Sequence, residues 1–195
     1  MQQHSFITLT GCDENNHPVA THVPVIPEFQ DGKIFLYGHV MKESDHRRAF
    51  EKNPEVLAVF SGPHCYVSAS WYSNQLQAST WNYMAVHAKG YLKFLDEDAL
   101  YIILRRLTTQ YEKNDESPSL VEKLPREYVK RLIKAIVGFK IEISEVNNVF
   151  KLSQNHNQQT YSNIIEKLEQ TDDAGRQIAE EMKKRKAELF HPVKE

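Results

Sequence analysis

Short segments rich in β-forming residues, separated by turn-forming sequences, occupy the first 95 residues of the chain. The turn sequences DENNHP, QDG, NPE and GP lie between them. Parallel neighbours need crossover connections of a dozen or more residues, so these short gaps predict antiparallel pairing. The predicted strands are SFITLTG (5–11), PVATHVPVI (18–26), KIFLYGH (33–39), EVLAVFS (55–61), HCYVSASW (64–71) and NYMAVHAKGYLKFL (82–95).

The second half of the chain is predicted to be mainly helical. Apolar residues recur at helical spacing near 98–113, near 126–137 and again from residue 161 onward. Between these runs, FKIEISEV (139–146) alternates apolar and polar residues, as a strand with one buried face does. In the first half, a shorter helix is predicted over 44–53, where Ser44 can act as the N-cap.

Strands first, helices later and one late strand are typical of an α+β fold built on an antiparallel sheet or barrel. The late strand at 139–146 is expected to complete the barrel, and the helices near 98–113 and 126–137 are expected to pack on it. The polar stretch SQNHNQQ (153–159) then marks a hinge. We therefore predict one domain over residues 1–152 and a C-terminal helical extension over 153–195.

Charge and cysteine content narrow the class of protein. The formal net charge is −2, whereas a dedicated nucleic-acid binder usually carries a basic domain or stripe. No apolar run approaches the roughly 20 residues that span a bilayer, and the N-terminus lacks the pattern of a secretion signal. Cys12 and Cys65 show no metal-binding spacing. A cytoplasmic protein with reduced thiols, without membrane association, is expected.

Residues 61–94 contain both tryptophans and an unusual mixture of aromatic and hydroxyl side chains. Successive strand residues point to opposite faces, so each strand has an apolar face and a second face. Aromatic rings beside hydroxyls suit a partner surface or a ligand wall, although the later helices could instead cover them. The second face carries His64, Tyr66, Ser68 and Ser70 from one strand, and Tyr83, His87, Lys89 and Tyr91 from the other.

Several segments resemble those of the PaiB family, which is grouped as FMN-binding negative transcriptional regulators. The similar segments are ATHVPV, GHV, FSGPHCYVSASWY, STWNYMAVHAKGYLKF, AIVGFKIEISEV and FKLSQN, and the resemblance covers about residues 5–170. It implies an FMN-binding split barrel with flanking helices, bound FMN and a homodimer with the flavin at the subunit interface. The aromatic face would then be the dimer and flavin surface, with Tyr66, Tyr72, Trp81 or Tyr83 in the interface.

The resemblance also implies an FMN site. The FMN phosphate needs Lys or Arg together with hydroxyls and backbone N–H groups. Lys42 and Ser44, at the start of the predicted 44–53 helix, fit that requirement, and Arg47 and Arg48 are weaker candidates. An ordinary exposed turn is the alternative for Lys42 and Ser44, and a structural role is the alternative for each histidine. The other predicted contacts are Thr21, His22, His39, Thr80, Trp81 and Asn82.

Some residues depart from the family pattern. GHVMKESD stands where the family has GHxAxxNP, and SASWY and STWNY each lack a proline of the family motif. Lost prolines leave loops less rigid, so weak FMN binding and isolation without FMN are expected.

The sequence nominates no catalytic residue and no metal site. It contains no nucleophile elbow, P-loop or dinucleotide fingerprint, and its histidines lack metal-ligand spacing. Without a helix-turn-helix pattern, direct DNA binding is not expected. Three hypotheses remain: a homodimeric flavin-binding regulator, a flavin-dependent oxidoreductase of unknown substrate, and a dimeric module without cofactor.

Overall fold

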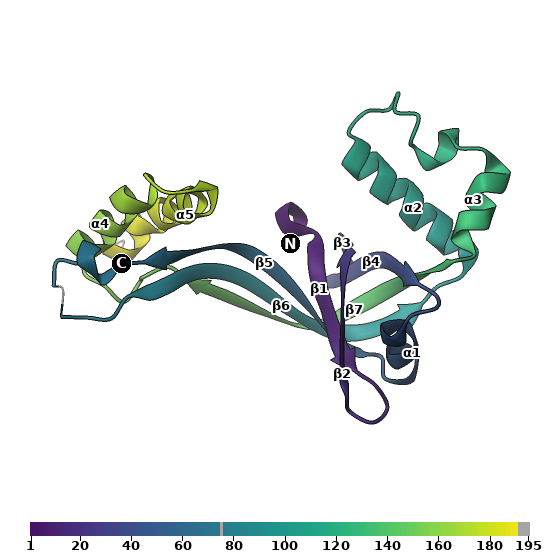
Figure 1. Ribbon diagram of the computed structural model, residues 1–195, viewed down its shortest axis with the longest axis horizontal. Coiled ribbons are helices and arrows are strands. Elements are labelled where there is room, and N and C mark those ends of the chain that lie inside the picture. Colours follow the sequence, from purple (N-terminus) through teal and green to yellow (C-terminus); the bar gives the residue numbers. More distant parts are fainter. Residues whose placement is uncertain (75, 191–195) are drawn as a thin grey trace. The chain divides into compact units, whose positions relative to one another are not determined.

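The computed structural model describes residues 1–74 and 76–190, which form two compact units (Figure 1). Unit 1 comprises Met1–Phe60 and His87–Asn147, and unit 2 comprises Ser61–Val86 and Asn148–Glu195. The boundary predicted at residues 152/153 lies inside unit 2. Within the described part of the chain, no helix combines the length and apolar character that a membrane span requires.

Seven strands form one sheet in the order β2-β1-β5-β6-β7-β4-β3. The β1–β2, β1–β5, β3–β4 and β4–β7 pairs are antiparallel, as the short turns predict. β5, β6 and β7 are long enough to contribute residues to both units. The strand bounds are β1 Phe6–Cys12, β2 Pro18–Pro24, β3 Ile26–Gln30, β4 Lys33–Met41, β5 Glu55–Val67, β6 Thr80–Phe94 and β7 Ile136–Lys151.

The order of the strands shows that the sheet curls into a barrel within unit 1. β2 and β3 form the two edges of the sheet, yet only Val25 separates their bounds. A flat sheet of seven strands, spaced at about 4.8 Å, would separate its edges by about 29 Å, far beyond the reach of one residue. At Gly38 of β4, an added Cβ would lie 3.0 Å from the carbonyl oxygen of Pro24, so the end of β2 touches β4. The predicted α+β fold with an antiparallel split barrel is confirmed.

Three helices of unit 1 pack their apolar sides on this barrel or on one another. α1 (Asp45–Lys52) buries Ala49 and Phe50. α2 (Glu97–Glu112) packs Ile103 and Leu107 against Ile26 of β3, and its Leu100 joins the apolar side of α3 (Arg126–Ile133). Short 3-10 turns lie at Gln2–His4 and Val121–Lys123. The helix predicted near 98–113 is thus present.

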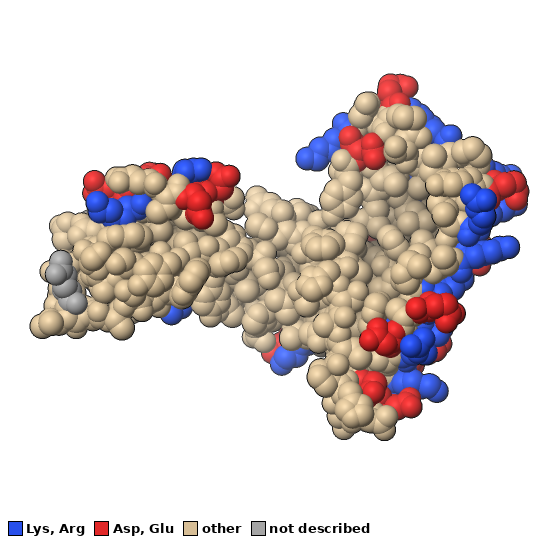
Figure 2. Space-filling view, in the orientation of Figure 1, with Lys and Arg blue, Asp and Glu red and all other residues tan. Residues whose placement is uncertain are grey.

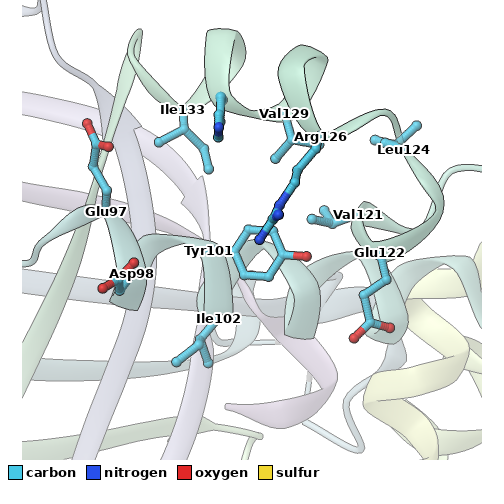
Figure 3. Close-up of a pocket in the computed structure, with 11 residues that line it drawn as sticks. Glu97, Asp98, Tyr101, Ile102, Val121, Glu122, Leu124, Arg126, Val129 and Ile133 are labelled. Carbon is cyan, nitrogen blue, oxygen red and sulfur yellow. The ribbon is translucent and has the colours of Figure 1, made fainter.

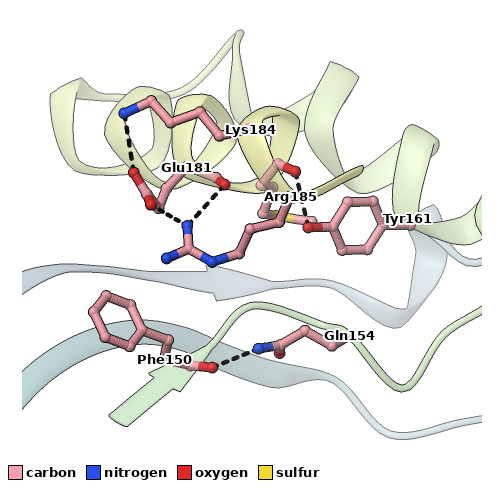
Figure 4. A network of polar contacts seen from close by, with 7 residues as sticks. Phe150, Gln154, Tyr161, Glu181, Lys184 and Arg185 are labelled. Carbon is pink, nitrogen blue, oxygen red and sulfur yellow. Dashed lines mark hydrogen bonds and ion pairs between the residues drawn. The ribbon is translucent and has the colours of Figure 1, made fainter. Parts of the chain in front are cut away.

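Unit 2 has a hydrophobic core of its own. α4 (Gln158–Leu168) and α5 (Asp173–Phe190) pack on the ends of β5 and β7 and on the 3-10 turn Ala69–Trp71. The buried hydroxyl of Tyr161 donates to the carbonyl of Met182 at 3.0 Å, and burial raises its pKa to about 12 (Figure 4). Around it, Glu181 pairs with Lys184 and Arg185 on α5. The basic cluster at 183–186 is therefore part of an ion-paired helix surface.

Two strand predictions differ from the structure, each for a tertiary reason. Gly62-Pro63 was predicted to break the chain, yet β5 runs through both residues. An added Cβ at Gly62 would lie 2.9 Å from the Met84 carbonyl oxygen, so the glycine leaves room for the backbone of β6 to approach closely. β1 pairs with β5 only along residues 56–59, so the missing N–H of Pro63 interrupts no ladder on that side. The predicted strand 18–26 is divided into β2 and β3, because the chain there passes from one sheet edge to the other.

The helix predicted near 126–137 was too long. α3 ends at Ile133, and Ile136, Val137 and Gly138 are the first residues of β7. Ile136 fits the helical spacing of α3, but its backbone pairs with Met41 of β4 instead. The late strand is also longer than the predicted 139–146, since it begins at Ile136 and its last residues, 148–151, belong to unit 2.

Candidate functional site

The start of α1 gathers polar groups suited to an anion in unit 1. Ser44 caps the helix: its hydroxyl accepts from the Arg47 backbone N–H at 3.3 Å and donates to the Met41 carbonyl at 2.9 Å. Lys42, two residues before this cap, has its ammonium 4.0 Å from a Glu97 carboxylate oxygen. That distance is at the outer limit of an ion pair, so the ammonium can still bind a ligand anion. Both residues were predicted as phosphate contacts.

Two buried nitrogens close in sequence to this cap have no hydrogen-bond partner among the described residues. They are Nδ1 of His39 and Nε of Arg47. The guanidinium of Arg47 is otherwise engaged, since Nη2 donates to Glu51 at 2.8 Å and the group lies over the Phe94 ring. An unsatisfied buried polar group is uncommon and calls for an explanation such as a ligand or water. Arg47 thus belongs with Lys42 as a cationic group beside Ser44.

His39 lies on the face of β4 that α2 covers. It pairs with Gly138 of β7, and residues directly opposite in a ladder project to the same face. An added Cβ at Gly138 would lie 3.3 Å from Leu100 of α2. The His39 side chain therefore shares the face on which α2 packs, and burial lowers the pKa of His39 below the ordinary value of 6.5.

Because of this burial, His39 is expected to make stability depend on pH. Its folded-state pKa is depressed, so the neutral ring contributes fully above about pH 6.5 and the unfolded chain takes up the proton below it. Unfolding free energy should fall from pH 6.5 downward by at most about 1.4 kcal/mol per pH unit from this group. His39→Gln should remove that part, as urea denaturation at pH 7.5 and 5.5 would show. If the unfolding free energies at pH 7.5 and 5.5 differ as much in His39→Gln as in the wild type, the assignment to His39 is contradicted.

Thr21 and His22 lie on opposite faces of β2, which contacts both β4 and α1. Thr21 is half-buried and opposite Leu9 of β1. His22 is exposed, and its ring stacks on that of Phe6 with centroids 6.2 Å apart. Five of the eight predicted contacts thus lie in unit 1, on β2, on β4 and at the start of α1.

The other three predicted contacts, Thr80, Trp81 and Asn82, begin β6 in unit 2. Trp81 is 53% exposed, whereas Asn82 is completely buried. The Asn82 amide accepts from the Ser153 hydroxyl at 3.0 Å and donates toward the Met182 sulfur at 3.6 Å. Thr80 accepts from the ammonium of Lys151 at 2.6 Å. Lys151 was not predicted, because it follows Thr80 by 71 residues and only the pairing of strands brings the two together.

An aromatic patch, defined as His64, Tyr66, Trp81 and Tyr83, lies on the outer face of β5 and β6 in unit 2. Tyr66 meets Trp81 edge-on with ring centroids 6.0 Å apart, and His64 lies 6.1 Å from the same ring. Figure 2 shows few charged side chains over these strands. Tyr72 was also expected on this surface, but only 4% of it is exposed and it packs in the core of unit 2. That expectation for Tyr72 was wrong, since the chain turns inward after the 3-10 turn at Ala69–Trp71.

Unit 1 also contains a cavity of about 750 Å³ between α2 and α3, which holds none of the predicted residues (Figure 3). The Arg126 side chain extends toward the Tyr101 ring, and Glu97, Asp98 and Glu122 line the rim. Its described lining residues mix both charges and include no unpaired buried polar group, so the cavity has no definite ligand chemistry. Among the described residues, no group of three or more histidine, cysteine, aspartate or glutamate side chains could hold a metal ion.

Comparison with known proteins connects this barrel to a flavin-binding family. Residues 1–145 match the family model described as "Putative FMN-binding domain". The protease synthase and sporulation protein PAI 2 of Bacillus subtilis is 37% identical over 183 residues, which cover 93% of this chain and 87% of that protein.

Two solved structures share the fold at low identity. A "putative 5-nitroimidazole antibiotic resistance protein" of Bacteroides thetaiotaomicron aligns with a TM-score of 0.54 and 16% identity, covering 75% of this chain and 76% of that one. An FAD- and haem-binding protein of Mycobacterium smegmatis aligns with a TM-score of 0.53 and 16% identity, covering 75% and 65%. The family match and the identity to PAI 2 together show that the chain belongs to the PaiB family of FMN-binding-domain proteins.

Proposed function

We propose that the protein binds FMN, with the phosphate held in unit 1 at the start of α1. The observation that carries this proposal is the set of available cationic groups around one helix cap. Lys42 has only a 4.0 Å contact with Glu97, and Arg47 keeps a buried Nε without a described partner. The positive end of α1 also favours an anion there, while the Ser44 hydroxyl, whose proton goes to the Met41 carbonyl, caps the helix start. The residues present therefore fit the group that the family implies.

The other predicted contacts do not all have the same role in this proposal. Thr21 and His22 offer a hydroxyl and an imidazole from β2, which contacts α1. Trp81 lies in unit 2, and its exposed indole belongs to the aromatic patch rather than to the phosphate site. His39 and Asn82 are covered by other elements, so we propose that they support the surrounding structure rather than contact FMN directly.

Fluorescence quenching of added FMN tests the proposal. FMN should bind saturably even where the isolated protein is colourless, and riboflavin should bind at least about tenfold more weakly. The missing phosphate removes charge-assisted hydrogen bonds, each worth roughly 1.5–3 kcal/mol. Unchanged FMN fluorescence at high protein concentration would leave the hypothesis of a dimeric module without cofactor.

We further propose that two copies associate through the aromatic patch. Tyr66, Trp81 and Tyr83 are 50%, 53% and 37% exposed, and a groove of about 300 Å³ lies beside them. The cores of protein interfaces are typically rich in aromatic residues and poor in charged ones, as this patch is. A specific interface buries on the order of 1,200–2,000 Å² in total, so the patch would form only its centre.

Sedimentation equilibrium tests the dimer. The wild type should sediment as a dimer at micromolar concentration, and the double variant Tyr66→Lys with Trp81→Lys should sediment as a monomer. Tyr91→Lys is the matched control, because Tyr91 is a 54%-exposed tyrosine that lies on the same strand as Trp81 but outside the patch. A monomeric wild type, or a double variant that remains dimeric, would contradict the proposal.

The proposed biological role is regulatory, in the cytoplasm. It is supported by the relative named for protease synthesis and sporulation. The net charge of −2 and the ion-paired 183–186 cluster favour regulation through a ligand or another protein rather than by direct DNA reading. A sequence-selective, salt-dependent gel shift with purified protein would overturn that view.

A further inference from the structure

A second cavity, in unit 2, has the composition of an anion site. It has a volume of about 450 Å³ and lies among the loop before β6, the start of β6 and the end of β7. Hydroxyl, amide, ammonium and imidazole groups make up its polar lining. The described lining residues are Tyr72, Gln77, Ala78, Ser79, Thr80, Asn82, Lys151, Ser153, Asn155 and His156.

The charged groups that line this cavity distinguish it from other cavities of the molecule. Lys151 is its one fixed charge among the described residues, and the lining includes no carboxylate. The α2–α3 cavity, by contrast, combines three carboxylates with Arg126 and Lys130. A further cavity of about 640 Å³ beside β1 places Glu55 and Glu145 with Lys89. An ammonium without a carboxylate at its own cavity favours an anionic ligand.

Two hydroxyl groups of the cavity are oriented as donors by the contacts they accept. Thr80 accepts from the ammonium of Lys151 at 2.6 Å, so the proton of its own hydroxyl is available elsewhere. Ser79 likewise accepts from the backbone N–H of Ala69 at 3.0 Å. The Lys151 ammonium carries three N–H groups, so it keeps donors for a ligand after the contact with Thr80. These three groups together can bind the oxygens of one anion.

The hydroxyl of Tyr72 supplies an independent indication of a ligand. Tyr72 lines the cavity and is only 4% exposed, yet its hydroxyl has no hydrogen-bond partner among the described residues. The His156 ring packs on it, with centroids 4.5 Å apart. Burial, and to a smaller extent the neighbouring Tyr66, raises the pKa of Tyr72, so the hydroxyl keeps its proton as a donor. Leaving such a donor unpaired in a folded protein costs free energy, which a bound acceptor would recover.

We propose that this cavity binds the oxyanion of a small molecule, a phosphate or carboxylate group, through Lys151, Thr80, Ser79 and Tyr72. The site goes beyond the FMN proposal, although it uses Thr80, which the sequence analysis placed with FMN. It lies entirely within unit 2, whereas the proposed FMN phosphate contacts lie in unit 1.

Intrinsic fluorescence of the full-length protein tests the site, because both tryptophans, Trp71 and Trp81, belong to unit 2. Inorganic phosphate and acetate are titrated separately, with sodium chloride keeping the ionic strength constant. A saturable change with phosphate alone assigns a phosphoryl ligand, and one with acetate alone assigns a carboxylate. A response to neither anion, or the same response to sodium chloride alone, would overturn the proposal.

Two variants separate binding from a purely structural role. Lys151→Gln should weaken anion binding at least about tenfold, whereas Lys167→Gln, an equal change of charge at an exposed position of α4, should not. Tyr72→Phe should weaken binding severalfold without lowering the urea midpoint, since its hydroxyl has no described partner to lose. Equal anion affinity in wild type and Lys151→Gln would overturn the assignment, and a lower midpoint with unchanged affinity in Tyr72→Phe would make that hydroxyl structural.

Discussion

Replacing Gly90 by alanine is expected to destabilise the protein by about 3 kcal/mol, the upper end of the usual cost of overpacking. An added Cβ at this position of β6 would lie 2.3 Å from the Glu142 carbonyl oxygen and 2.9 Å from Ile141 Cγ2. The backbone of β7 has little freedom to move away, because Ile141 and Glu142 pair with Leu36 and Phe35 of β4 on its other side. The barrel must therefore distort or lose part of a ladder.

Gly32→Ala is the matched control for this substitution. Gly32 has a φ of +76° in an exposed turn, and nothing lies within 4 Å of an added Cβ. The cost there is only that of a left-handed conformation, about 1–2 kcal/mol. Urea denaturation of both variants compares the two costs. Equal losses, or a Gly90→Ala protein with wild-type stability, would show that β6 and β7 are not in close contact at this position.

Lys42→Ala is expected to weaken FMN binding at least about tenfold. The substitution removes a charge-assisted phosphate contact worth roughly 1.5–3 kcal/mol, and about 1.4 kcal/mol corresponds to each factor of ten. Riboflavin, which has no phosphate, should bind the wild type and the variant equally. The effect of the mutation should therefore appear with one flavin and disappear with the other.

The control for Lys42→Ala is Lys52→Ala, which removes the same charge from the other end of α1. It should leave FMN affinity unchanged, since the helix start and its cap at Ser44 are untouched. If both variants bind FMN as the wild type does, the cofactor proposal survives but its phosphate lies elsewhere. If both weaken FMN equally, the effect is one of overall charge rather than of a defined contact.

Local signals predicted the parts of the fold whose boundaries are set locally. Ser44 caps α1, and Asp96 caps α2 by accepting from the Ala99 N–H at 2.9 Å, so both helices start near the predicted positions. Where pairing with a distant strand decides the structure, the same reasoning failed. Gly62 and Gly138 look like breaks in the sequence, yet each is a place where another element approaches the backbone closely.

The candidate sites were predictable only in part, for a related reason. Lys42 and Ser44 are two residues apart, and the predicted helix start was enough to bring them together. Lys151 and Thr80 lie 71 positions apart and meet only because β6 and β7 run through unit 2. The burial of Tyr72 depends on α4 and α5, which a strand-by-strand reading of 61–94 does not include.

Equilibrium dialysis against FMN tests the central proposal most directly. Each chain has one Lys42–Ser44 cap, so wild-type protein at high concentration should retain FMN saturably, approaching one FMN per chain. Added inorganic phosphate should compete for that binding, because it carries the group that the cap is proposed to hold. Retention of no FMN above the buffer control, at any FMN concentration up to saturation of the solution, would contradict the account.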